Sequence, residues 1–402
     1  MGKFLHFSSP FNSINSQISD QPEFSLSSDS SLASQPSLPS VPSLEQPAAA
    51  ADPHCSATLK SHSYVFSLAI AGEHLYCGDA DGKIAVCDRN LISPENYNST
   101  PVAISSTAVK SIVISGDKIF AAHQDNKIRV WKIDDNSTSQ QKYRKITVLP
   151  TLSDRCARLF SAENYVKVRR HKKRTWIHHN DAVSALAITN NGSLLYSVSW
   201  DRTFKVWRTS DFKCLESVQN AHDDAINAVV LSADGFVYTG SADRTIKVWR
   251  KNDVVEKHTL ISTLEKHISA VNALALSADG SVLYSGACDR SIIVWEKEGG
   301  ASHMTVAGAL RGHTKAILCL AVVNDLLFSG SADKTVRVWR RSGESGNSYS
   351  CLAVFEGHRN PIKCLTACLD SDNSNRADSY VVYSGSLDCE IKVWRFWVPF
   401  GI

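Results

Sequence analysis

The chain has 402 residues, a net charge of +3 and eleven cysteines. This charge balance argues against a dedicated DNA-binding protein, and the odd number of singly placed cysteines argues against a disulfide framework. No run approaches 18 apolar residues, so no transmembrane helix is expected. The opening MGKFLHFSSPF holds too short an apolar run for a signal peptide. We therefore expect a protein of the cytoplasm, the nucleus or both.

Residues 1–54 differ in composition from the rest of the chain. They contain fourteen serines and seven of the twelve prolines, and their net charge is −4. Their apolar residues are scattered singly, so the segment buries too little surface to offset the entropy of ordering it. We predict that residues 1–54 are a disordered Ser/Pro-rich tail.

From residue 55 to residue 402 one sequence unit is repeated seven times. The fourth copy reads AHDDAINAVVLSADGFVYTGSADRTIKVWR, in which apolar positions alternate between Gly/Asp turns. This period-2 pattern predicts short antiparallel strands. Most repeats end 42–46 residues apart, at a tryptophan or its replacement: Cys87, Trp131, Trp207, Trp249, Trp295, Trp339 and Trp394. A repeat of about 40–45 residues predicts an all-β, seven-bladed β-propeller.

The two ends of the repeat region complement each other. Residues 55–60 have the pattern of an outer strand but precede the first blade, while the last repeat has no outer strand after Trp394. We predict that residues 55–60 complete blade seven beside residues 390–395. Such pairing would leave the sheet fewer exposed edges.

A long insertion, residues 151–178, separates blades two and three. The outer strand of blade two is either residues 143–149 or residues 172–178, and the sequence leaves both open. Apolar residues at near-helical spacing predict a short helix packed on the ring: Leu152, Cys156, Leu159 and Phe160.

The insertion also carries a basic run around His171. Its residues are Arg169, Arg170, Lys172, Lys173 and Arg174. The run predicts a nuclear-import signal or a patch for an acidic partner. The alternative is a solvated loop or strand face without a binding role.

The repeats resemble the WD40 family over residues 55–402. In that family a buried hydrogen-bond chain links a His, a Ser or Thr, an Asp and a Trp within each blade. Blades three to seven match this tetrad: His179, Ser197, Asp201, Trp207; His222, Thr239, Asp243, Trp249; His267, Ser285, Asp289, Trp295; His313, Ser329, Asp333, Trp339; His358, Ser384, Asp388, Trp394. Blade one has Cys77 and Cys87 in place of Ser and Trp. Blade two lacks the His and has Ala121 at the Ser position, so we expect these two blades to be less stable.

The five His/Ser/Asp sets invite comparison with a catalytic triad. A catalytic site is normally singular and open to substrate, whereas these sets recur in every matching blade. The sequence also holds no phosphate-binding glycine loop and no metal-ligand cluster. We therefore expect no enzymatic activity, no cofactor and no metal.

In WD-repeat proteins one rim of the ring is the usual docking face, and two positions in each blade point to it. The resemblance assigns to the first position Phe66, Lys110, Ser184, Asn227, Asn272, Leu318 and Lys363. It assigns to the second position Ala80, Gln124, Trp200, Ala242, Cys288, Ala332 and Leu387. We call this rim the top rim.

Trp200 stands where most blades have a small residue, so we expect a partly exposed indole. An exposed aromatic ring near Lys110 and Lys363 is typical of a binding hot spot. The alternative is that Trp200 folds over its own blade as a lid. Together with Tyr64 and Phe66, these residues predict a site for a peptide with acidic and apolar side chains.

A narrower resemblance is to the plant Jingubang-type WD-repeat proteins. The shared features are the Ser-rich head, the opening HSYVFSLAI and the block NYVKVRRHKKRTWIHHNDAVSALAI at residues 164–188. This resemblance implies a non-enzymatic scaffold of the cytoplasm and nucleus. It also implies a role in pollen germination and tube growth through a transcription-factor partner.

The alternative function is a substrate receptor of a cullin-type ubiquitin ligase. Such receptors often carry Trp-Asp-x-Arg at the end of a blade. Here the residue after each tryptophan is never Asp: Lys132, Arg208, Arg250, Glu296, Arg340 and Arg395. We expect a monomer that binds other proteins, has no membrane contact and does not bind nucleic acid directly.

Overall fold

The computed structural model describes residues 45–46, 54–89, 100–134, 142–158, 162–169, 172–252, 254–297, 303–342, 348–370 and 379–398. All of these residues belong to one structural unit, Ser37–Ile402. The predicted disordered tail lies outside the described residues, apart from positions 45, 46 and 54. Within the described part, no helix is both long and apolar enough to cross a bilayer.

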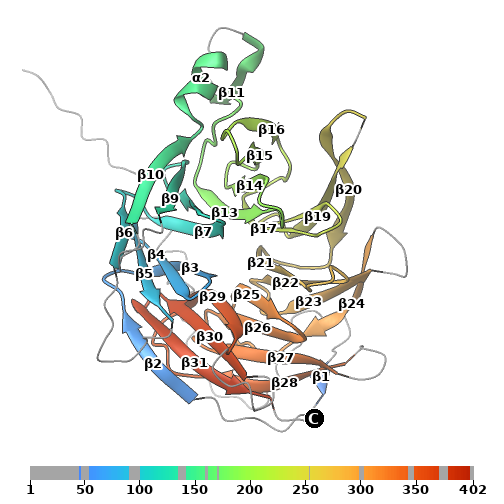
Figure 1. Ribbon diagram of the computed structural model, residues 1–402. Coiled ribbons are helices and arrows are strands. Elements are labelled where there is room, and N and C mark those ends of the chain that lie inside the picture. The colour runs from blue at the N-terminus through green and yellow to red at the C-terminus, as the bar shows by residue number, and fades with distance from the viewer. Residues whose placement is uncertain are drawn as a thin grey trace, which may run out of the picture. The chain divides into compact units, whose positions relative to one another are not determined.

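Seven four-stranded antiparallel sheets form the blades of a β-propeller, as predicted (Figure 1). Blades one to three consist of β3 (Val65–Ala71), β4 (His74–Asp79), β5 (Lys83–Asp88), β6 (Thr100–Ile104); β7 (Val109–Ser115), β8 (Lys118–His123), β9 (Ile128–Asp134), β10 (Lys142–Leu149); and β13 (Val183–Ile188), β14 (Leu194–Ser199), β15 (Phe204–Arg208), β16 (Cys214–Val218).

Blades four and five consist of β17 (Ile226–Leu231), β18 (Phe236–Ser241), β19 (Thr245–Asn252), β20 (Lys257–Glu265); and β21 (Val271–Leu276), β22 (Val282–Ala287), β23 (Ile292–Lys297), β24 (Met304–Leu310). Blades six and seven consist of β25 (Ile317–Val323), β26 (Leu326–Ser331), β27 (Val336–Ser342), β28 (Ser348–Phe355); and β29 (Ile362–Leu369), β30 (Ser379–Ser386), β31 (Glu390–Trp397), β2 (His54–Lys60).

The ring is closed by strands from the two ends of the repeat region. The innermost strands contact one another in a circle, β3 to β7, β13, β17, β21, β25, β29 and back to β3. The outer strand of blade seven is β2, which pairs antiparallel with β31. Leu59 of β2 is fully buried, and it packs with Leu75 of blade one and Tyr383 of blade seven. The apolar core therefore continues from the last blade to the first.

A fifth strand on blade six was not expected from the sequence. Strand β1 (Glu45–Gln46) pairs in parallel with the outer edge of β28, opposite Tyr349 and Ser350. This backbone pairing covers part of an exposed sheet edge.

Neighbouring sheets approach most closely at a recurring glycine. A Cβ atom on Gly78, Gly240, Gly286, Gly330 or Gly385 would lie within 2.9 Å of the first side chain of the next innermost strand. On Gly385 it would lie 2.5 Å from Val65 Cγ1 and 2.6 Å from Cys364 Sγ. The glycine is therefore required by the packing of adjacent blades.

We expect Gly385→Ala to destabilise the ring by about 1–3 kcal/mol, because the added methyl group overpacks the junction of blades seven and one. Thermal unfolding followed by circular dichroism measures this loss. An unchanged melting temperature would show that the junction has room to relax.

The insertion between blades two and three forms a helix and a two-stranded ribbon. Its elements are α2 (Leu152–Arg158), the 3-10 turn η2 (Ala162–Asn164), β11 (Tyr165–Arg169) and β12 (Lys172–Thr175). β10 is the outer strand of blade two, and β12 pairs with β11 instead. Of the two segments that the sequence left open, the structure therefore selects the first.

The short helix is present, but the described part of its predicted apolar stripe does not pack on the ring. Leu152 and Cys156 are exposed, and Leu159 and Phe160 lie outside the described residues. The buried residue of α2 is Asp154, whose carboxylate accepts a hydrogen bond of 3.0 Å from the backbone amide of Cys214 in blade three. The described contacts between α2 and blade three are polar.

Candidate functional site

Each of blades three to seven contains the tetrad as a continuous hydrogen-bond chain. In blade five, Trp295 Nε1 donates to Ser285 Oγ at 2.8 Å, and Ser285 Oγ lies 2.8 Å from His267 Nε2. His267 Nδ1 is 2.8 Å from an oxygen of Asp289. The same bonds recur in the other four blades.

The tetrads have the properties of structural networks. Burial alone would raise the pKa of Asp289, but hydrogen bonds from His267 and Ser291 hold it below its usual range. The side chains of His267 and Asp289 are almost completely buried. Because each polar atom already has a partner and little solvent access, the geometry favours stabilisation of the blade over catalysis.

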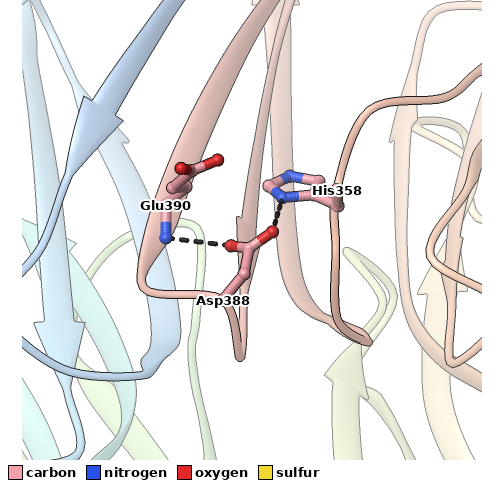
Figure 2. A group of neighbouring side chains, drawn as sticks. All are labelled: His358, Asp388 and Glu390. Carbon is pink, nitrogen blue, oxygen red and sulfur yellow. Dashed lines mark hydrogen bonds and ion pairs between the residues drawn. The ribbon is translucent and has the colours of Figure 1, made fainter.

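In blade seven the tetrad gains a second carboxylate. His358, Asp388 and Glu390 come together there, with potential ligand atoms within 4.8 Å of one another (Figure 2). The atoms are already paired: His358 Nδ1 lies 2.9 Å from Asp388, and the Glu390 carboxylate contacts Arg359 at 2.7 Å and Lys392 at 3.4 Å. The contacts describe an ion-pair cluster, since a metal would have to displace several of these partners.

Blade two replaces the tetrad with a contact between Ser105 and His123 that was not predicted from the sequence. Ser105 occupies the place of the tetrad His, and His123 lies at the end of β8, fully buried. His123 Nδ1 is 3.1 Å from both Ser105 Oγ and the carbonyl of Thr107. Burial lowers the pKa of His123 to about 4. In the sequence this histidine is recognisable as the last residue of the second strand, four residues after Ile119.

The first rim position has the same backbone geometry in all seven blades. In each innermost strand the pairing with the next strand shifts by one residue at this position, which forms a β-bulge. A bulge re-aims the side chain at a sheet end. The bulged residues are Phe66, Lys110, Ser184, Asn227, Asn272, Leu318 and Lys363.

A backbone hydrogen bond that recurs in all seven blades holds the second rim position close to the first. In every blade its backbone amide donates to a carbonyl just before the innermost strand, over 2.8–3.1 Å. The donors are Ala80, Gln124, Trp200, Ala242, Cys288, Ala332 and Leu387. Both sets of positions therefore lie on the same rim, where each second strand turns into the third.

Residues of blades one, two and three meet on the top rim. The ammonium of Lys110 lies 4.5 Å from the ring centroid of Phe66 and 5.3 Å from that of Trp200. Burial lowers the pKa of Lys110 to about 8, and the charge of Lys363 lowers it further. Trp200 is half-buried, and Tyr64, beside Phe66, is 46% exposed.

The Lys110 ammonium has no hydrogen bond or ion pair with any side chain or carbonyl of the described chain. Its only partners there are the two aromatic faces, which attract it through their electron-rich surfaces. We name Phe66, Lys110 and Trp200, with Tyr64 and Lys363 beside them, the aromatic-cationic patch. It can accept an anionic group from solution.

Other predicted rim residues bridge neighbouring blades. Asn227 Nδ2 donates to the carbonyl of Val271 at 3.0 Å, and Asn272 Nδ2 donates to that of Ile317 at 2.9 Å. Their side-chain amides therefore already donate hydrogen bonds within the ring. Half-buried side chains complete the rim at three further predicted positions: Gln124, Leu318 and Leu387.

The predicted basic run is distributed over the two strands of the ribbon. Arg169 ends β11, while Lys172, Lys173 and Arg174 belong to β12. Arg170 lies outside the described residues. The run is therefore part of a paired ribbon on both sides of its turn.

Comparison with known proteins identifies the repeats. The family described as WD domain, G-beta repeat matches five segments, which together make up half of the chain: residues 170–208, 212–250, 258–296, 304–340 and 349–395. These segments cover the blades that contain a complete tetrad.

A curated relative is the "66 kDa stress protein" of Physarum polycephalum, which is 24% identical over 151 residues. The match covers 35% of this chain, and the chain spans a quarter of that relative's length. The resemblance to the Jingubang-type group gains no support from this relative. The repeats, the seven sheets and the tetrads show that the chain belongs to the WD40 family.

Proposed function

We propose that the chain is a non-enzymatic scaffold that holds a short segment of another protein on the aromatic-cationic patch. WD40 propellers are protein-interaction folds in general, so the question is which surface is used. The observation that carries the proposal is the Lys110 ammonium, which lies between two aromatic faces without an anion. An acidic side chain would supply that anion, while apolar neighbours covered Phe66 and Trp200.

The proposal extends to the setting that the resemblance to Jingubang-type proteins implies. It comprises a cytoplasmic and nuclear regulator, a transcription-factor partner, and a role in pollen germination and tube growth. Its support is the inserted block at residues 164–188. No observation favours a ubiquitin-ligase receptor, because no blade ends in Trp-Asp.

Binding of short peptides tests the rim. Selection from a random peptide library is expected to enrich sequences with acidic and aromatic or aliphatic residues. The triple variant Trp200→Ala, Lys110→Glu, Lys363→Glu should bind the selected peptides at least about 30-fold more weakly, which is the loss expected for a hot spot. Fluorescence anisotropy with labelled peptides measures this difference.

The matched control truncates one apolar side chain and reverses two lysine charges on exposed residues of blades three and four. Its changes are Leu215→Ala, Lys213→Glu and Lys257→Glu. It should bind like the wild type, and all proteins should melt alike. Equal affinity of the rim variant and the wild type would place the peptide site elsewhere.

The pH dependence of binding reports on Lys110 itself. Because its pKa is about 8 in the free chain, the ammonium loses its proton as the pH rises from 7 to 9.5. We expect the affinity for an acidic, end-capped peptide to be constant between pH 6 and pH 7 and to fall above pH 8. Lys110→Arg should retain its affinity through pH 9.5, since a guanidinium stays protonated. A flat profile for the wild type would remove Lys110 from the site.

A further inference from the structure

The insertion between blades two and three carries most of the chain's excess positive charge. Residues 151–178 include eight Lys or Arg and two Asp or Glu, a net charge of +6, while the whole chain has +3. With −4 on residues 1–54, the remaining blades are left with about +1. In Figure 1, α2 and β11 lie outside the ring of sheets. The positive charge of the chain is therefore concentrated on this insertion.

A set of hydrogen bonds connects the ribbon to blade three. The guanidinium of Arg158 in α2 donates to the carbonyl of Cys214 at 3.1 Å and lies 4.7 Å from the ring of Trp176. Trp176 Nε1 in turn donates to Asn164 Oδ1 at 3.1 Å. The helix, the start of β11 and the end of β12 thus form one anchored base.

Basic residues occupy opposite positions in the backbone register of the ribbon. In the β11–β12 register Lys167 is opposite Lys173, and Arg169 is opposite Lys172. Like charges at directly opposite positions destabilise a strand pair. A ribbon with this register gains stability from an anion.

The base of the ribbon shows the same uncompensated charge. Burial lowers the pKa of His178 to about 4, and Arg155 and Arg174 lower it further. Neither Arg155 nor Arg174 forms an ion pair with any of the residues that the structure describes. The two acidic residues of the insertion do not change this, because Asp154 is buried against Arg158 and Glu163 has no such contact.

We propose that the β11–β12 ribbon and α2 form a second docking surface, which binds an acidic segment of a partner protein. This surface is independent of the aromatic-cationic patch on the top rim. Its recognition is electrostatic. It rests on Arg155 and Arg174 and on the basic residues that the sequence places on the two strands, Lys167, Arg169, Lys172 and Lys173.

The distribution of charge favours a protein over a nucleic acid. A nucleic-acid site needs basic residues along the path of several phosphates, whereas here the positive charge ends at the insertion.

The pairing of β11 with β12 argues against a simple nuclear-import signal. A receptor that reads a single extended chain would first have to separate these two strands.

Fluorescence anisotropy tests the surface with a defined probe, a capped 20-residue peptide of alternating Glu and Ser. The ribbon variant is Lys172→Gln, Lys173→Gln, Arg174→Gln. The matched control removes the same charge from exposed lysines of blades three and four: Lys213→Gln, Lys251→Gln, Lys257→Gln. A 20-nucleotide single-stranded RNA serves as the second probe, at 50 and 200 mM salt.

We expect the ribbon variant to bind the peptide at least tenfold more weakly than the wild type, and the control to bind within twofold of it. The top-rim triple variant should keep most of its affinity, which separates this surface from the proposed function. Hydrogen exchange should show slower exchange of the β11 and β12 amides when the peptide is bound. Equal binding by the ribbon variant, no binding by the wild type, or tighter binding of the RNA would overturn the proposal.

Discussion

Removal of residues 1–60 is expected to prevent the ring from folding, whereas removal of residues 1–53 should leave it intact. The longer deletion takes away β2, the outer strand of blade seven. It exposes the edge of β31 and removes Leu59 from the core. Burial of the Leu59 side chain contributes about 1.5–3 kcal/mol by itself. Together with the lost strand pairing, this loss is comparable with the 5–15 kcal/mol that stabilises a typical domain.

Thermal melting and size-exclusion chromatography of the two truncated chains provide the measurement. Leu59→Ala in the longer chain is the graded control, and its loss should be about 2–5 kcal/mol. Addition of a synthetic peptide of residues 54–61 should restore part of the stability of the shorter chain. If the chain that begins at residue 61 melts within a few degrees of the other, β2 does not hold the ring closed.

Asp289→Ala is expected to cost about 3–5 kcal/mol, because it leaves buried donors without their acceptor. The affected donors are His267 Nδ1, the amide of Ile268 and the amide and hydroxyl of Ser291. In a domain of this size the melting temperature should fall on the order of 10 °C.

Asp279→Ala in the same blade is the matched control. Asp279 lies in an exposed turn and accepts hydrogen bonds from Ser277 and Ser281. Its replacement should cost about 1 kcal/mol or less, since solvent can satisfy the same donors. A result in which both variants melt alike would mean that the tetrad contributes nothing beyond an ordinary turn.

The blades and their tetrads can be predicted from the sequence because every member is set by local spacing. A turn Asp such as Asp243 follows its strand at a fixed distance, and Trp249 follows the turn. The closing strand is predictable for a different reason, since a blade without an outer strand requires one from elsewhere in the chain.

Other contacts could not be predicted, because no side-chain pattern signals them. β1 pairs with β28 through main-chain groups, and its Glu45–Gln46 sequence resembles no strand. Hydropathy does not show that Asp154 is the buried residue of α2, because the stabilising contacts are polar. The outer strand of blade two stayed ambiguous because both candidate segments have strand-like composition.

The aromatic-cationic patch lies between these two cases. The repeat assigns Phe66, Lys110 and Trp200 to one rim, but it cannot show that the ammonium of one blade lies against the rings of two others. That contact depends on the bulge at each innermost strand and on the spacing between sheets.

The closure of blade seven also fixes the order of events during synthesis. Apart from the short strand β1, the ribosome makes β2 before every other strand of the ring and β31 last. About 330 residues separate Lys60 from Glu390. At about 5–20 residues per second, β2 waits roughly 15–65 s for its partner. Blades one to six are each contiguous in the chain and can form as they emerge, while Leu59 stays in water. A nascent chain that stalls before blade seven therefore presents an open arc with an unpaired apolar strand, the state in which chaperones and proteases would meet this protein.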